Sequence, residues 1–407
     1  MICGAGNRPL WLSERKMTDL SNLYYRLCMS SVFLKVLESP LFKCFEKYCK
    51  AERGSDEKIK AYSAFVSEIY KSAGTLSGLV ERLVFEDENV YVRAVAHKTL
   101  PRREVIAAAK AELSVFDEFA SITSEDFALD MGISYVSPFV SGKSSLLKKY
   151  MTRMQGIERY GYGIFSSHPM FRLSDECIIE PIVSADQTTL DKFIGYGEER
   201  QKIIHNTVNF LDGKPAANAL LYGDAGTGKS STVKAVVNAF FDRGLRLIEL
   251  RKDQLHYLPY VMGKVSENPL KFIIFIDDLS FNQNDDNFSM LKAALEGSAS
   301  AKAKNAIIYA TSNRRHIVKE LFSDREGGDV HRNDTMQENL SLSERFGLTV
   351  LFAKPDKKLY IEIVYELADR NNIDLDRAEL AVRAEAFAIR KGNRSARCAE
   401  QFIDSLM

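Results

Sequence analysis

The sequence predicts an α/β protein with a parallel five-stranded sheet, a C-terminal helical lid and a mainly helical region in front. Three observations lead to this prediction. From about residue 185 the chain alternates helical segments with short apolar runs, five of these runs have the length of strands, and one strand-to-helix turn has a glycine-rich phosphate-binding pattern. At 407 residues the chain is also too long for one ordinary domain.

The first part of the chain is predicted to be a mainly helical domain over residues 18–180. Apolar residues recur at helical spacings in Leu20 to Cys49 and again in Val105 to Phe119. Residues 88–97 alternate apolar and polar side chains, which predicts a short strand. The turn-rich, aromatic stretch 160–183 is expected to be the seam between the two domains.

Residues 1–17 show neither a helical pattern nor the continuous apolar core of a signal peptide. We expect a flexible N-terminus there, and Met17 is a candidate for the true start of the protein.

The nucleotide-binding α/β domain is expected over residues 185–355, and the lid over residues 356–407, which show helical patterns only. The five predicted strands are 219–223, 245–250, 271–277, 305–312 and 348–353. Helical segments between them would provide the crossovers that a parallel sheet needs.

The sequence GDAGTGKS, residues 223–230, matches the phosphate-loop pattern and lies between a predicted strand and a predicted helix. Its glycines let backbone N–H groups converge on phosphate oxygens, and the helix N-terminus adds a favourable partial charge. Lys229 would neutralise the β- and γ-phosphates, and the Ser230 hydroxyl would reach Mg²⁺. The predicted nucleotide-binding residues of this loop are Gly223, Asp224, Ala225, Gly226, Thr227, Gly228, Lys229, Ser230 and Ser231.

Two acidic residues follow the apolar run FIIFI at the end of the third predicted strand. Asp277 would hold Mg²⁺, largely through water, and Asp278 would polarise the attacking water. The alternative is that these aspartates only cap a following helix, since Asp is a favoured N-cap residue.

Four more polar residues are candidates for binding or hydrolysing nucleotide, two of them as alternatives for one role. Asn313, at the end of the fourth predicted strand, would position water, although Asn also favours strand-ending turns. Arg345, just before the fifth, would act on a neighbouring subunit's γ-phosphate, unless it is an ordinary surface arginine. Near the C-terminus either Arg394 or Arg397 would reach the phosphates, and Arg397 is better placed if Ser395 is the helix N-cap. The alternative is that both arginines are solvated.

Together these motifs resemble the AAA+ ATPase superfamily over residues 185–407. The chain is more closely similar to an uncharacterised bacterial AAA+ family that shares LLYGxxGTGKSS, DDLSF, LEG, YATSNRRH, GGDVHRND and SLSERFG. Within that superfamily, the domain resembles helicase-loader and clamp-loader proteins more than rings that thread proteins.

The resemblance implies a role for each candidate. Gly228, Lys229 and Ser230 take the Walker A positions, and Asp277 and Asp278 those of Walker B. The resemblance further implies sensor 1 at Asn313, the arginine finger at Arg345, sensor 2 at Arg397, and adenine contacts at Ile194 and Gly195. Asp278 departs from the superfamily, which usually has Glu there, so slow turnover is an expectation.

The predicted function is therefore Mg-ATP binding and hydrolysis at subunit interfaces of a homo-oligomer. This turnover would remodel or load a protein or nucleoprotein partner through the N-terminal domain. The alternative is an ATP-gated assembly or scaffold protein with negligible turnover. No guanine-reading N-K-x-D tetrapeptide occurs, which argues against a GTPase.

Composition limits the partners and the location. With 55 basic and 55 acidic residues, the chain lacks the positive charge by which a histone-like protein binds nucleic acid. The basic residues 312–316 are either a local contact to nucleic acid or have a solvated or phosphate-sensing role. No apolar run is long enough to span a bilayer, and six cysteines without C-x-x-C pairing are typical of reduced thiols. We expect a cytoplasmic protein that contacts no membrane.

Overall fold

The computed structural model describes residues 18–72, 74–184, 187–280, 290–292, 295, 303–313 and 345–407. The chain divides into two compact units, the first ending at Gly156 and the second beginning at Ile157. The motif GGDVHRND and parts of LEG, DDLSF, YATSNRRH and SLSERFG lie outside the described residues, as do residues 1–17.

The first unit is helical in its described part. Its helices are α1 (Leu20–Cys28), α2 (Leu34–Leu37), α3 (Pro40–Lys50), α4 (Asp56–Lys71), α5 (Leu76–Glu86), α6 (Val90–Ala96), α7 (Arg103–Ser121), α8 (Ser124–Met131) and α9 (Leu146–Gln155). Aromatic side chains fill its core, with the Phe45 ring 4.9 Å from that of Phe119. The strand predicted over residues 88–97 is wrong, because Asn89 caps α6 by accepting the Val92 N–H at 2.9 Å.

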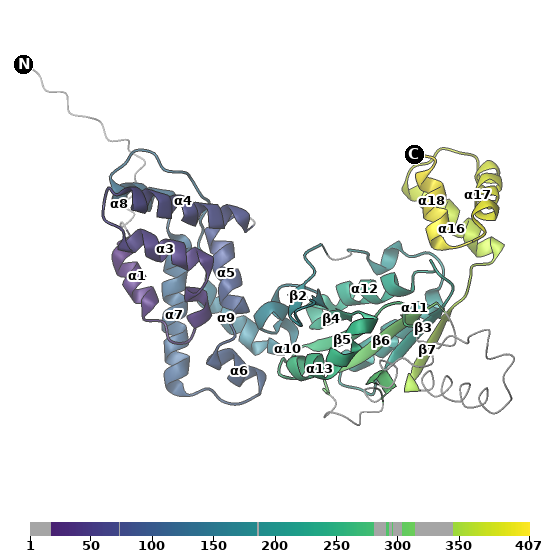
Figure 1. Ribbon diagram of the computed structural model, residues 1–407, viewed down its shortest axis with the longest axis horizontal. Helices are drawn as coiled ribbons and strands as arrows, with labels where there is room; N and C mark the ends of the chain where they lie inside the picture. The colour runs from purple at the N-terminus through teal and green to yellow at the C-terminus, as the bar shows by residue number, and fades with distance from the viewer. Residues whose placement is uncertain are drawn as a thin grey trace, which may run out of the picture. The chain divides into compact units, whose positions relative to one another are not determined.

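The second unit is built on a sheet that has seven strands among the described residues, in the order β2-β1-β4-β5-β6-β3-β7 (Figure 1). The strands are β1 (Met170–Leu173), β2 (Ile179–Pro181), β3 (Ala219–Gly223), β4 (Leu245–Leu250), β5 (Lys271–Ile276), β6 (Ala306–Ser312) and β7 (Leu348–Phe352). All neighbouring pairs are parallel except β1 with β2.

The five predicted strands are β3 to β7, and the prediction of a five-stranded sheet is wrong because two more strands lengthen one edge. β1 pairs in parallel with β4, with Phe171 opposite Ile248, and β2 folds back along β1. Both strands come from the stretch expected to be a seam between domains. Their pairing places that stretch in the second unit.

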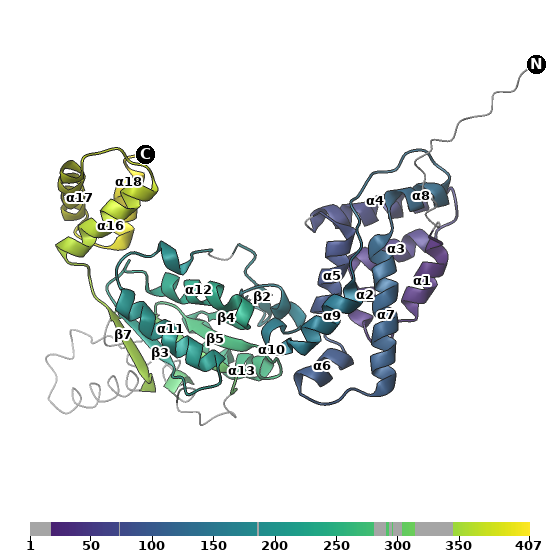
Figure 2. The same ribbon diagram turned by 180° about the vertical axis from the view of Figure 1, so that it is seen from behind.

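Helices cover both faces of this sheet (Figures 1 and 2). On one face, α11 (Gly197–Leu211) and α12 (Lys229–Phe240) pack Ile203 and Val236 onto Leu221 and Phe275. On the other face lie α13 (Leu258–Ser266) and the 3₁₀ turns Gly163–Ser166 and Lys252–Tyr257. Two further 3₁₀ turns, Leu190–Lys192 and Phe241–Arg243, contact α12, and the short helix α10 (Ile157–Tyr160) contacts the second of these turns.

The chain ends in three helices with a core of their own. They are α16 (Lys357–Arg370), α17 (Arg377–Lys391) and α18 (Ala396–Asp404), which we call the C-terminal helical subdomain. Tyr360, Ala384 and Phe402 are buried between them. Throughout the described part of the chain, no helix combines the length and apolarity needed to cross a bilayer.

Candidate nucleotide-binding site

The glycine-rich turn predicted to bind phosphate connects β3 to α12. Gly226 and Gly228 have φ values of +76° and +86°, a region that side chains with a Cβ rarely adopt. At Gly223 a Cβ would lie 2.1 Å from the Phe352 carbonyl oxygen, so only glycine fits beside β7. The sequence therefore provides a tight loop that ends at the N-terminus of a helix, where N–H groups are available to an anion.

Lys229 lies within this loop, and its side chain is almost fully buried. Its Nζ donates to the carbonyl oxygens of Gly223 at 3.0 Å and Asp224 at 2.7 Å, and to Asn313 Oδ1 at 3.1 Å. Burial lowers the pKa of the Lys229 ammonium, while nearby carboxylates, Asp224 first among them, oppose that shift. The loop thus holds a desolvated ammonium at the place where the phosphates are expected.

Asp277 follows β5 and faces the start of α12. Its Oδ1 accepts a hydrogen bond from Ser230 Oγ at 2.6 Å. The same oxygen accepts from the Asp278 N–H at 3.1 Å and from the Thr311 hydroxyl. A hydroxyl and a carboxylate this close are the kind of oxygen ligands that Mg²⁺ takes, so Ser230 and Asp277 fit such an ion.

The described residues contain no group of three or more His, Cys, Asp and Glu side chains that could hold a metal by themselves. A Mg²⁺ ion at Ser230 and Asp277 would therefore complete its shell with phosphate oxygens and water, as this ion commonly does.

Asn313 connects the phosphate loop to the second aspartate. It follows β6, which lies between β5 and β3 in the sheet, so its side chain leaves the same edge as Lys229 and Asp278. Besides accepting from Lys229, Asn313 donates from Nδ2 to Asp278 Oδ1 at 2.6 Å. Asp278 itself is exposed and has φ +50°, the left-handed region. The structure thus brings Lys229, Asn313 and Asp278 into one hydrogen-bonded chain.

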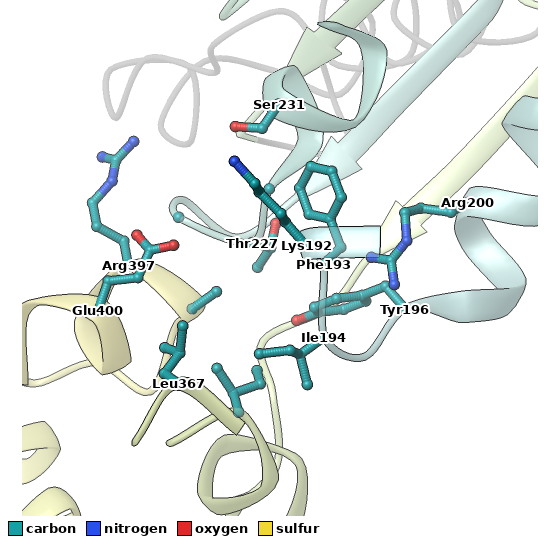
Figure 3. Close-up of a pocket in the computed structure, with 14 residues that line it drawn as sticks. Lys192, Phe193, Ile194, Tyr196, Arg200, Thr227, Ser231, Leu367, Arg397 and Glu400 are labelled. Atoms are coloured by element: carbon teal, nitrogen blue, oxygen red, sulfur yellow. The ribbon is translucent and has the colours of Figure 1, made fainter. Parts of the chain in front are cut away.

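A pocket of about 160 Å³ opens beside the loop. Gly226, Thr227, Gly228 and Ser231 line one part of it, and Figure 3 shows Arg397 and Glu400 facing them from the C-terminal helical subdomain. The rest of the lining is Lys192, Phe193, Ile194, Tyr196, Arg200, Ile363, Leu367 and Ala396. The pocket therefore joins the phosphate loop to an apolar and aromatic surface.

Of the two residues predicted to contact the base, Ile194 lines this pocket. Gly195, with φ +70°, turns the chain beside it, and a Cβ there would lie 2.7 Å from Leu359 Cδ1. Gly195 therefore lets this segment approach α16 closely.

The two candidate arginines near the C-terminus have different surroundings. Ser395 caps α18 by accepting the Cys398 N–H at 3.2 Å. This cap is the condition under which the sequence favoured Arg397 over Arg394. Arg397 lines the pocket, and its backbone N–H donates to the Gly226 carbonyl at 3.4 Å. Arg394 instead forms an ion pair with Glu385 of α17. Only Arg397 of these two is next to the phosphate loop.

Arg345 is not part of this cluster. It lies three residues before Leu348, which pairs with Ala219 at the start of β3. The phosphate loop follows the opposite end of β3, a separation of roughly 15 Å along the strand. The structure therefore places Arg345 near the amino ends of β3 and β7, whereas the phosphate loop of its own chain lies at their carboxyl ends.

Three residues of the pocket, Phe193, Arg200 and Glu400, were not predicted from the sequence. Phe193 lies close to Gly228, and the guanidinium of Arg200 lies over the Phe193 ring with 5.1 Å to its centroid. Glu400 lines the pocket one helical turn after Arg397. The (i, i+3) spacing of these two residues was a usable signal for Glu400, whereas the Phe193–Arg200 contact depends on the left-handed turn at Tyr196.

A family model described as "Protein of unknown function (DUF815)" matches residues 166–407, and the chain belongs to this family. No curated protein matches the sequence. Among solved structures, the RuvB Holliday junction branch migration motor of Thermotoga maritima is similar at 14% identity, over 53% of this chain and 71% of that chain, with a TM-score of 0.33. A single-residue variant of that protein has 13% identity, the same coverage and a TM-score of 0.32.

Proposed function

We propose that this member of the DUF815 family binds Mg-ATP and hydrolyses it, as an ATPase of the AAA+ type. The observation that carries the proposal is the hydrogen-bonded chain from Lys229 through Asn313 to Asp278. It runs across the carboxyl ends of the parallel strands β5, β6 and β3, beside the Ser230–Asp277 pair. Parallel sheets bind ligands at the carboxyl ends of their strands, where these five side chains meet.

Each residue has a task in this reaction. The N–H groups of the loop and the Lys229 ammonium bind the phosphates and stabilise charge on the transferred group. Ser230 and Asp277 would hold Mg²⁺, which supplies further charge neutralisation when bound.

Asp278 and Asn313 orient a water molecule, whose oxygen attacks the γ-phosphorus while the bond to the bridging oxygen breaks. The water proton passes to Asp278, and ADP leaves with the bridging oxygen.

The pocket next to the loop suits the rest of the nucleotide. Ile194, Phe193 and Leu367 offer apolar surface to a base, and Gly195 holds that segment against α16. Arg397 contributes a permanent positive charge on the side of the pocket opposite Thr227 (Figure 3). This combination of a few charged groups with an apolar wall is typical of nucleotide pockets.

A second candidate is an ATP-gated assembly protein with negligible turnover. Asp278 favours it, because its arm is one methylene shorter than that of Glu and its carboxylate already accepts a hydrogen bond from Asn313. Steady-state phosphate release, together with sedimentation in the presence of Mg-ATP, separates the two candidates. Assembly without turnover would support the second.

The wider proposal is that subunits assemble and remodel or load a protein or nucleoprotein through the N-terminal helical unit. Arg345 supports assembly, since an arginine far from its own phosphate loop can serve a neighbouring subunit. ATPase measurements with and without single-stranded and duplex DNA test whether nucleic acid is that partner.

The first prediction tests ATP binding itself. Lys229→Ala removes the buried ammonium and should weaken Mg-ATP binding at least about a hundredfold, as expected for a charge-assisted contact to phosphate. Titration with a fluorescent ATP analogue measures the affinity. Lys234→Ala is the matched control, because Lys234 lies on the same helix but pairs with Glu249. Micromolar affinity retained in folded Lys229→Ala protein would refute the site.

A further inference from the structure

One side chain of the phosphate loop connects it to the C-terminal helical subdomain. Asp224 Oδ2 accepts a hydrogen bond from the Lys354 N–H at 2.9 Å, and the Asp224 N–H donates to the Phe352 carbonyl at 3.2 Å. Lys354 belongs to residues 353–356, the linker between β7 and α16. Asp224 therefore contacts the chain just where it leaves the sheet for the subdomain.

We propose that Asp224 is a positioning residue that couples occupancy of the phosphate loop to the linker, and through the linker to the C-terminal helical subdomain. The inference rests on the proposed function, since it needs a nucleotide in the loop.

The linker is short and is held at several points. Tyr196 donates its hydroxyl to the Ala353 carbonyl at 2.6 Å, and Asp356 caps α16 by accepting the Leu359 N–H at 2.7 Å. With both neighbours of Lys354 and Pro355 fixed, few backbone rotations are left for the subdomain to move against the sheet. The hydrogen bond from Lys354 to Asp224 limits those rotations directly.

A bound nucleotide would change the surroundings of Asp224. In the structure, Lys229 Nζ donates to the Asp224 carbonyl oxygen at 2.7 Å. Phosphates compete for this ammonium, and their negative charge repels the Asp224 carboxylate in the same loop. Both effects act on the residue that holds Lys354, so we expect nucleotide binding to weaken that hydrogen bond.

A second contact supports transmission to the whole subdomain. The Gly226 carbonyl accepts the Arg397 N–H at 3.4 Å, and a Cβ on Gly226 would lie 3.0 Å from Ser395 Oγ. The loop thus contacts the subdomain at its entrance and at the start of α18. Because the three helices share one core, a shift at either point moves them together.

Hydrogen–deuterium exchange of the full-length protein tests the coupling at the Lys354 amide. Exchange is compared without nucleotide, with Mg-ADP and with a non-hydrolysable Mg-ATP analogue, for wild type, Asp224→Ala and Asp224→Asn. Tyr365→Phe is the control, because it removes one hydrogen bond of α16, to the Arg377 carbonyl, without contacting the loop. ATP affinity and turnover are measured in parallel on the same samples.

In wild type we expect Lys354 exchange to be slow without nucleotide and at least about threefold faster with the ATP analogue. Asp224→Ala should raise nucleotide-free exchange about tenfold or more and remove the nucleotide response, as for loss of one hydrogen bond. Asp224→Asn keeps an acceptor without the charge, so it should retain protection but respond less. Turnover should fall in both variants, and exchange is compared at saturating nucleotide, so that a change in ATP affinity caused by altering this loop residue does not enter the comparison.

An unchanged nucleotide response in Asp224→Ala, or slower Lys354 exchange in nucleotide-bound wild type, would overturn the coupling and leave the ATPase proposal intact. Failure of the wild type to bind any nucleotide would instead overturn the proposed function, and the coupling with it.

Discussion

Asp278 is the residue on which turnover depends most in the proposed reaction. It is exposed at the sheet edge, adopts φ +50° and receives a hydrogen bond from Asn313. Its N–H donates to Thr311 Oγ1 at 2.9 Å, which fixes its backbone to β6. This arrangement holds a short carboxylate in place and leaves its outer oxygen available to water.

The second prediction separates binding from hydrolysis at this residue. Asp278→Asn keeps the shape of the side chain but cannot accept the water proton, so ATP should bind within about threefold of wild type while turnover falls at least about a hundredfold. Equilibrium binding and phosphate release on the same samples measure both quantities. Asp175→Asn serves as control, since Asp175 is an exposed partner of Arg251. Unchanged turnover would mean that Asp278 is only a cap.

At the residue scale, the sequence was sufficient where a side chain is fixed by the strand that precedes it. Asp277 and Asn313 follow strands whose apolar runs are plain in the sequence, so their common edge could be predicted. Phe193 and Arg200 follow no strand. Their position depends on two left-handed residues, Gly195 and Tyr196, which no periodicity reveals.

At the element scale, α2 shows how a short helix is held in the N-terminal unit. Glu112 of α7 is buried, and its carboxylate accepts the N–H groups of Ser31 at 2.7 Å and of Val32 and Phe33 at 3.1 Å. Asp87 is also buried, and the backbone N–H groups of Lys35 and Val36 oppose the rise that burial causes in its pKa. The Glu112 carboxylate therefore fixes the backbone that leads into a four-residue helix, whose own N-cap residue provides no side-chain hydrogen bond.

The third prediction concerns pH. Burial raises the pKa of Asp87 to about 6, against an ordinary value near 4. The folded state therefore binds a proton that the unfolded state lacks between these values, and the stability from this group is lost as pH rises from about 4 to about 6. The change is at most about 3 kcal/mol.

Asp87→Asn should flatten this dependence and raise the stability of the N-terminal unit at pH 7 relative to wild type. Hydrogen exchange of α7 core amides, corrected for intrinsic rates, measures the free energy of opening at each pH. Glu118→Gln, which alters a partly exposed ion pair with Arg26, should keep the wild-type slope. A wild-type slope in Asp87→Asn would show that another group titrates.

The elements that the sequence missed are those whose state is decided by tertiary contacts. β1 and β2 have four and three residues, too few for a periodic pattern, and they become strands by pairing with β4 and with each other. Pro181 is tolerated in β2 because that strand lies at the edge of the sheet. In α6, the Asn89 cap outweighs an alternation that is typical of strands.

At the scale of the whole molecule, the two arginines that the motifs assign to phosphate binding, Arg345 and Arg397, differ in their position relative to the phosphate loop of their own chain. Arg397 approaches the loop from the C-terminal helical subdomain, but Arg345 lies near the amino ends of the strands, away from the loop. If Arg345 acts on phosphate at all, it acts on the nucleotide of another subunit. This assignment makes hydrolysis a property of the assembly, whereas ATP binding belongs to each subunit.

The last prediction tests Arg345 across subunits. A finger supplied in trans is worth about 10³-fold or more in rate, because its planar charged fork pairs with phosphate oxygens in the transition state. Arg345→Ala should therefore lose hydrolysis and ATP-induced assembly but keep ATP binding by isolated subunits. Arg370→Ala is a control, since Arg370 hydrogen-bonds to the Lys192 carbonyl within one chain.

The decisive measurement mixes Arg345→Ala with Lys229→Ala protein and follows phosphate release. A mixed interface can place an intact phosphate loop opposite an intact Arg345, so part of the activity should return and should peak near equal proportions. Arg345→Ala and Lys229→Ala subunits that co-sediment yet stay inactive at every ratio would exclude a trans role. Arg345 would then act only within its own chain, where its position before β7 points to a structural function.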